Sequence, residues 1–113
     1  MIFFENKRLN EAGTLISFSA VENDIRLGSC VLSLEKEYAE VTEISCGENA
    51  QIIADGLIKS AFNYAANKNF YMGRCRIDGM DALLLSLNFI RTDNGFENDI
   101  PSILMGKCGC CGK

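Results

Sequence analysis

The chain has 113 residues, of which 48% are hydrophobic and 23% charged, as expected for one globular domain with a single core. Its net charge of −4 and the lack of a lysine or arginine cluster argue against a nucleic-acid partner. No apolar run reaches the length of a membrane span and the N-terminus lacks the order of a signal peptide, so we expect no membrane association and a cytoplasmic location. The absence of histidine excludes a Ser-His-Asp or Cys-His triad and a His-ligated zinc site.

The first part of the sequence predicts strands joined by short turns. Residues 1–4 are a short apolar strand candidate, and residues 6–13 are polar and end in glycine, which indicates a loop or a single helical turn. Residues 15–21 alternate apolar and polar side chains, the pattern of a half-buried strand. Further strands at 25–34 and 38–46 would complete an antiparallel meander.

The last strand of this meander carries an irregular apolar pattern. Val41 and Ile44 are three residues apart, so they cannot face the same side of a regular strand. A β-bulge near Thr42 or Glu43 would return both side chains to the core, and bulges often lie beside functional sites.

The centre of the sequence predicts the longest amphipathic helix. Its apolar residues recur at the spacing of one helical face, namely Ile53, Leu57, Ile58, Ala61, Phe62 and Ala65. Glu48 or Asn49 can open this helix, and Asn67, followed by Lys68 and Asn69, can close it. The helical periodicity reaches back to Ala50 at the earliest.

The start of this helix follows directly on the carboxyl end of a strand, after a turn at Cys46-Gly47. Unpaired backbone N–H groups and the helix dipole favour an anion at such a place. The sequence therefore predicts a phosphate site here, with a helix that merely packs on the sheet as the alternative.

The remainder of the chain predicts further α/β structure. Residues 70–77 form a strand that should lie parallel to the strand before the helix, through a right-handed crossover. Asp78 or Asp81 can cap a second helix over 80–87, with Leu83, Leu84 and Leu87 as its buried stripe.

The end of this region predicts a final hairpin. Its strands would cover 89–92 and 96–105, with a turn at 93–95, and Pro101 would limit the second strand to an edge position or a break.

The order of these elements resembles the GNAT superfamily of N-acetyltransferases, over about residues 15–92. The family's acetyl-CoA motif, Arg/Gln-x-x-Gly-x-Gly/Ala, is matched from Gln51 to Gly56, with Ala54 in place of the first glycine. The resemblance implies that backbone N–H groups of this segment hold the CoA pyrophosphate. It also implies that the bulged strand offers its edge to the acetyl and pantetheine groups, and that the strand after the helix splays away from it. The implied cofactor-binding positions are Ile44, Cys46, Gln51, Ile53, Ala54, Asp55, Gly56 and Leu57.

A second stretch, LLLSLNF over 83–89, is similar to the family's Tyr-x-x-x-Gly-Phe ending. Asn88 stands in place of the glycine and Phe89 is kept, but Leu84 occupies the position of the tyrosine that usually donates a proton to the CoA thiolate. Residues 6–14 are too few for the two helices that usually wall the acceptor pocket.

N-acetyl transfer needs a group that removes a proton from the amine. Glu43, on the bulged strand, is the candidate base, with a solvated strand carboxylate as the alternative interpretation, and Glu40 is a weaker candidate on the same strand. Asp55 would repel a pyrophosphate if it faced inward, so we expect it to face solvent.

The cysteines form two groups. Cys30, Cys46 and Cys75 lie in predicted strands and should be small buried hydrophobes, whereas Cys108, Cys110 and Cys111 crowd a glycine-rich tail with two lysines. Three thiols so close together favour a soft metal ion, and a zinc site would take its fourth ligand from Cys75, Cys46, a carboxylate or a second chain. The alternatives are a redox-sensitive tail, an intermolecular disulfide, attachment of another group, or a mobile tail without a role.

Together these features predict an α/β (α+β) fold: a GNAT-like, mixed and mainly antiparallel sheet with a central helix and a smaller second helix. Residues 1–105 would form the domain and 106–113 a flexible tail. The predicted function is acetyl-CoA (acyl-CoA) binding, with possible N-acetyl transfer to a small amine. The alternatives are a non-catalytic thiol or metal-binding module built on the tail, and a homodimerising domain without a ligand.

Overall fold

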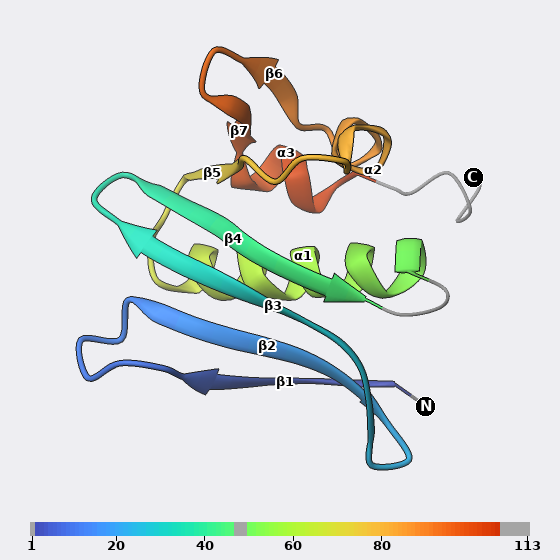
Figure 1. Cartoon of the computed structure of the whole chain (residues 1–113). Helices are drawn as coiled ribbons and strands as arrows, with labels where there is room; N and C mark the ends of the chain where they lie inside the picture. The colour runs from blue at the N-terminus through green and yellow to red at the C-terminus, as the bar shows by residue number, and fades with distance from the viewer. Residues whose placement is uncertain (1, 47–49, 107–113) are drawn as a thin grey trace.

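The computed structural model describes residues 2–46 and 50–106, which form a seven-stranded sheet in the order β1-β2-β3-β4-β5-β7-β6 (Figure 1). Only β4 and β5 pair in parallel, as the strand–helix–strand pattern predicted. The sheet is therefore mixed and mainly antiparallel, which confirms the predicted fold class. The strands are β1 (Phe3–Arg8), β2 (Leu15–Glu22), β3 (Ile25–Glu35), β4 (Tyr38–Cys46), β5 (Met72–Cys75), β6 (Ile90–Thr92) and β7 (Gly95–Asp99).

The central helix, α1 (Ala50–Asn67), packs across one face of β2, β3 and β4 (Figure 1). Its buried stripe is the predicted one, because Ile53, Leu57, Ile58, Ala61, Phe62 and Ala65 are all at most 3% exposed. The short helix α3 (Ile100–Leu104) covers β5 and β7 on the same face, where Ile103 and Phe62 meet over Gly73. The core is thus a single layer between the sheet and the helices. No helix in the described ranges is long and apolar enough to cross a membrane.

Two asparagines end helices in the left-handed conformation. Asn69 has φ +72° and follows α1, where the N–H of Phe70 bonds the carbonyl of Ala65. Asn88 has φ +69° and follows α2 (Asp81–Ser86), where the N–H of Phe89 bonds the carbonyl of Leu84. Both are Schellman motifs. The predicted closure of α1 is confirmed. Asn88 can adopt this conformation because asparagine tolerates it best after glycine.

The bulge predicted from the spacing of Val41 and Ile44 is present. Val31 pairs with Glu43 and Leu32 with Val41, so Thr42 is the extra residue of β4. The Thr42 hydroxyl donates to the carbonyl of Val31 at 3.5 Å. The insertion turns both apolar side chains toward α1, as expected.

Several local predictions were wrong. Residues 6–8 belong to β1 rather than to a loop, because an exposed edge strand tolerates polar side chains. Asp81 is the first residue of α2 and binds Arg91 at 2.7 Å, so it does not cap the helix, and the flanking Met80 makes no side-chain cap. The residues proposed to open α1, Glu48 and Asn49, lie outside the described ranges.

The last predicted strand is replaced in part by α3. Asp99 caps this helix by accepting the N–H of Ser102 at 2.8 Å, a bond that also lowers the pKa of the Asp99 carboxyl. Pro101 stands in the first turn, where its missing N–H is not needed. Gly106, which we assigned to the tail, is buried against Leu87.

Gly73 tests the packing of α1 and α3 on the sheet. A Cβ at this position would lie 2.7 Å from Cε1 of Phe62 and 2.9 Å from Cδ1 of Ile103, both in the core. We expect Gly73→Ala to lower the free energy of unfolding by about 1–3 kcal/mol, the usual cost of overpacking. Denaturant unfolding measures this loss. Adding Ile103→Val, which removes the clashing methyl group, should recover part of it, and a Gly73→Ala variant as stable as the parent would contradict the packing.

Candidate functional site

The sheet opens between its two parallel strands. β4 and β5 pair from Tyr38↔Met72 to Val41↔Cys75, and β5 ends there. β4 continues to Cys46, and no strand in the described part of the chain pairs with this further stretch on the β5 side. The bulge at Thr42 begins directly after the last paired residue. The backbone edge of β4 is therefore free for a ligand where the strands part, as the splay expected from the family resemblance requires.

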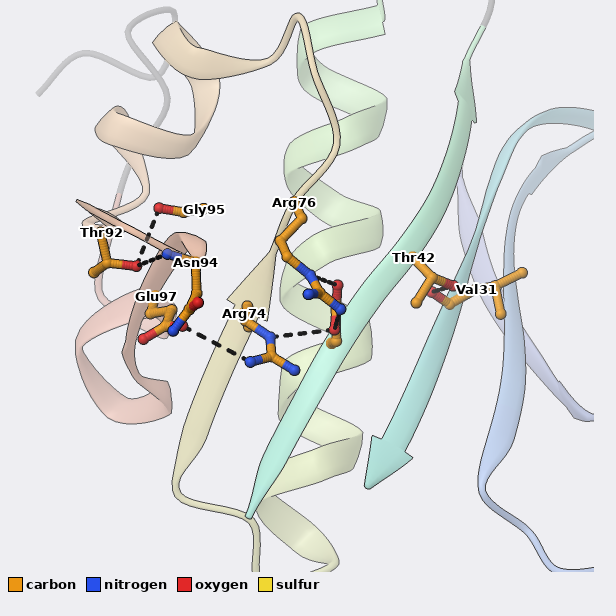
Figure 2. A network of polar contacts seen from close by, with 9 residues as sticks. Val31, Thr42, Arg74, Arg76, Thr92, Asn94, Gly95 and Glu97 are labelled. Atoms are coloured by element: carbon orange, nitrogen blue, oxygen red, sulfur yellow. Dashed lines mark hydrogen bonds and ion pairs between the residues drawn. The ribbon is translucent and has the colours of Figure 1, made fainter. Parts of the chain in front are cut away.

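A carboxylate on β4 joins the two strands just before they part. Glu40 accepts hydrogen bonds from Nε of Arg74 at 3.2 Å and from Nε and Nη2 of Arg76 at 2.8 and 3.0 Å. Figure 2 shows the side chains of Arg74, from β5, and Arg76, just beyond its end, reaching toward β4 on the sheet face opposite α1. The carboxylate is only 12% exposed, and it raises the pKa of the Arg76 guanidinium through these hydrogen bonds and its charge. We call Glu40, Arg74 and Arg76 the strand clasp.

Neighbouring side chains hold the first arginine of the clasp in place. The Arg74 guanidinium lies 4.4 Å from the ring centroid of Tyr38, and its Nη1 lies 3.9 Å from Oε2 of Glu97 on β7. Because Glu40 already accepts three N–H donors, it is a poor candidate for a base that takes a proton from a substrate.

Glu43, the candidate base, has a different environment. It is exposed, lies next to the bulge, and pairs with Val31, whose side chain faces away from the buried Cys30 and Leu32. Its carboxylate therefore stands on the face opposite α1, where no helix in the described ranges covers β1 to β4. A soluble molecule can reach it there.

A pocket lies on the other side of the splay. Its volume is about 290 Å³, and it is lined by Gln51 and Ala54 of α1 and by Gly79, Met80, Ala82 and Leu83 around the start of α2. Figure 1 shows α2 and the first turn of α1 at the end of the sheet where β4 terminates. Apart from Gln51, the lining side chains are apolar or absent, which suits an apolar or extended ligand.

The predicted cofactor-binding residues are divided between this pocket and the core. Gln51 and Ala54 line the pocket. Ile53 and Leu57 are 3% and 0% exposed and pack on the sheet. Sequence reasoning did not assign Gly79, Met80, Ala82 and Leu83 to the site, because no local pattern shows that the start of α2 meets the start of α1. Ile44 and Cys46 are half-buried on the α1 side of β4.

Asp55 and Gly56 do not lie in an open turn, because α1 already begins at Ala50. The side chain of Asp55 is only 14% exposed and lies 3.5 Å from Nζ of Lys59, so the expectation that it faces solvent was wrong. A Cβ on Gly56 would lie within van der Waals distance of the Phe4 ring, so this glycine makes room for an aromatic side chain of β1.

Two of the three described cysteines, Cys30 and Cys75, are buried as predicted, whereas Cys46 is only half-buried. Cys30 and Cys75 are both 1% exposed, and burial raises the pKa of the Cys30 thiol to about 12. Burial also raises the pKa values of Cys75 and of the half-buried Cys46. No metal-binding group occurs among residues 2–46 and 50–106. The tail cysteines Cys108, Cys110 and Cys111 lie outside these ranges.

The strand clasp can be tested against an exposed ion pair in the same chain. We expect Glu40→Gln to lower the free energy of unfolding by about 1–3 kcal/mol, because a carboxylate that is only 12% exposed loses its charge-assisted bonds to the half-buried Arg74 and the exposed Arg76. The matched control is Asp81→Asn, which removes the Arg91–Asp81 pair, 62% and 50% exposed, and should cost less than about 1 kcal/mol. Equal losses in denaturant unfolding would contradict the assigned role of Glu40.

Comparisons with known proteins support the fold rather than a particular activity. No family model matches the sequence, and no curated protein matches it. Solved structures do match. An N-acetyltransferase from Staphylococcus aureus Mu50 aligns with a TM-score of 0.64 at 20% identity, over 77% of this chain and 69% of that one.

Two further matches contain coenzyme A. The E. coli protein YhhK, named as an N-acetyl transferase, aligns with a TM-score of 0.69 at 11% identity, over 88% of this chain and 98% of that one. The PaiA N-acetyltransferase from Thermoplasma acidophilum aligns with a TM-score of 0.61 at 16% identity, over 76% of this chain and 61% of that one. The chain therefore has the fold of the GNAT N-acetyltransferases.

Proposed function

We propose that the protein binds acetyl-CoA or another acyl-CoA at the splay between β4 and β5, and that it transfers the acyl group to a small amine. The observation that carries this proposal is the free backbone edge of β4 beyond Val41, beside a pocket at the start of α1. Two structures of the same fold hold coenzyme A, which supports acyl-CoA as the ligand.

The pocket suits the pantetheine arm of the ligand. This arm is an extended chain with two amide groups, so it can pair with a free strand edge while its methylene groups contact apolar side chains. The carboxyl-terminal half of β4 supplies the edge, and Met80 and Leu83 supply apolar surface. The backbone N–H groups of the first turn of α1 are left without helical partners and would face the pyrophosphate.

The amine would approach from the opposite face of the sheet. Glu43 is exposed on that face beside the bulge, so its carboxylate can take a proton from an ammonium group while the amine attacks the thioester carbon through the splay. The nitrogen of the tetrahedral intermediate gives its remaining extra proton to water, and the carbon–sulfur bond breaks. The CoA thiolate takes a proton from solvent, since Leu84 replaces the family's tyrosine and is fully buried.

Binding can be tested on two exposed positions of α2. Ala82 lines the pocket, whereas Leu85 is 51% exposed and does not. We expect Ala82→Glu to weaken acetyl-CoA at least tenfold, about 1.4 kcal/mol, because it places bulk and negative charge in the pocket. Leu85→Glu adds the same charge to the same helix outside the pocket, so it should leave the affinity nearly unchanged. Calorimetric titration of the reduced protein with acetyl-CoA measures both.

Three results would contradict the proposed site. They are no heat of binding up to about 1 mM acetyl-CoA, equal affinities for the two variants, and binding that Leu85→Glu alone disrupts.

Catalysis can be tested separately from binding. Glu43→Gln should lower kcat for acetyl transfer by about 10²–10⁴-fold and leave acetyl-CoA affinity unchanged, because the amide cannot accept the proton. Chromatographic loss of acetyl-CoA with a panel of small amines is the measurement, since the six cysteines would interfere with a thiol-colour reaction. Glu22→Gln, at the far end of β2, is the control. An unchanged kcat in Glu43→Gln would remove this residue from the mechanism.

The cysteine tail supports a second candidate function, the binding of a soft metal ion. It rests on the three thiols within Cys108–Cys111 and on the preference of thiolates for such ions. Metal analysis of the purified protein, compared with a variant carrying serine at all three positions, tests it. A metal content that is the same in both proteins would exclude the tail as the site.

A further inference from the structure

The first strand of the sheet offers a complete edge for pairing. β1 lies at the end of the strand order, all six of its residues are exposed, and no strand in the described part of the chain lies beyond it (Figure 1). The opposite edge is formed by β6, which has only three residues. A six-residue exposed edge is a template for another strand, and the question is which strand fits it.

The backbone of β1 determines which residues can pair outward. Leu9 donates its N–H to the carbonyl of Leu15 on β2 at 2.8 Å, and the register continues through Arg8↔Ile16. In an antiparallel pair, the N–H and C=O of one residue point to the same neighbour, and successive residues alternate. Lys7 and Glu5 therefore face β2. Phe4, Asn6 and Arg8 direct their backbone groups to the free edge.

We propose that β1 pairs antiparallel with β1 of a second copy of the chain, about a two-fold axis at Asn6. Asn6 then bonds Asn6 of the partner subunit through both backbone groups. Glu5 lies opposite Lys7 of the partner subunit, and by symmetry the opposite-charge pair occurs twice. The contact is isologous, so it closes at two copies.

The side chains at the ends of the strand fit the same register. Phe3 and Leu9 are 59% and 49% exposed in one chain, and the pairing brings Phe3 against Leu9 of the partner subunit. Phe4 is 41% exposed and would lie opposite the partner's Arg8, a favourable cation–π combination. Each of these exposed apolar side chains thus gains a matching partner.

Repulsion between like charges disfavours the two neighbouring registers of this strand pair. If the two-fold axis passes through Glu5 instead, the outward-facing backbone groups still form hydrogen-bonded pairs, but Glu5 lies opposite Glu5 of the partner subunit. Moving the axis to Lys7 places Lys7 on Lys7 of the partner subunit. Like charges directly opposite each other destabilise a strand pair, so the axis at Asn6 is favoured over both. This edge is separated from the splay by β2 and β3, so the pairing leaves the splay open, and the proposal does not depend on acyl-CoA binding.

The test exchanges the two charges. Sedimentation equilibrium of the reduced wild-type protein should give a dimer. Lys7→Glu carries two acidic residues and Glu5→Lys carries two basic residues at the pairing positions, so each variant alone should dimerise at least tenfold more weakly. Mixing the two variants restores opposite charges at every position and should restore the dimer.

A backbone variant tests the hydrogen bonds directly. Asn6→Pro removes an N–H that faces away from β2, so the fold should be kept while the dimer is lost. Its thermal unfolding, monitored by circular dichroism, serves as the folding control.

Three outcomes would overturn the proposal. They are a wild-type monomer up to about 100 µM, a dimer that none of these variants weakens, and a mixture of the two charge variants that stays monomeric.

Discussion

The candidate site depends on one constraint, the point at which β4 and β5 stop pairing. The two strands are parallel over four residue pairs, and the strand clasp binds them just before the end of this ladder. A parallel pair this short is weakly held by its backbone bonds alone. A carboxylate that accepts from Arg74 of β5 and from Arg76, just beyond that strand, therefore contributes much to its position. Beyond the clasp, the bulge at Thr42 increases the local twist of β4 and turns it away from the end of β5.

The same sheet explains how the chain keeps this fold with only a short loop between β1 and β2. The face opposite α1 carries small polar side chains on β2 and β3, including Ser17, Ser19, Ser29 and Ser33, so it can face water without loss of core. The fully buried apolar residues of the same strands, such as Ile16, Phe18 and Leu32, point toward α1. Residues 9–14 between β1 and β2 form a short loop, closed by the side chain of Asn10. The face of the splay that carries Glu43 is consequently open.

Patterns confined to one element allowed correct predictions from the sequence. The three-residue spacing of Val41 and Ile44 predicted the bulge, and the apolar stripe predicted the buried face of α1. Features that depend on contacts between distant elements could not be predicted. The pocket needs the start of α2 beside the start of α1, and the burial of Asp55 depends on its position at the edge of the packed face of α1. The sequence prediction missed α3 because proline indicates a break in a strand. Pro101 equally suits the first turn of a helix, and Asp99 caps that helix.

Gly56 shows that a residue can match a family motif without having the role that the motif implies. Gly56 lies inside α1, where glycine costs up to about 1 kcal/mol relative to alanine. The structure provides a local reason for it, because the Phe4 ring lies where a Cβ would be. That contact fixes β1 against α1 and holds its outer edge in place. The pocket is instead lined by Gln51, Ala54 and the residues around the start of α2. The first two turns of α1 therefore serve the packing of the first strand as well as one wall of the pocket.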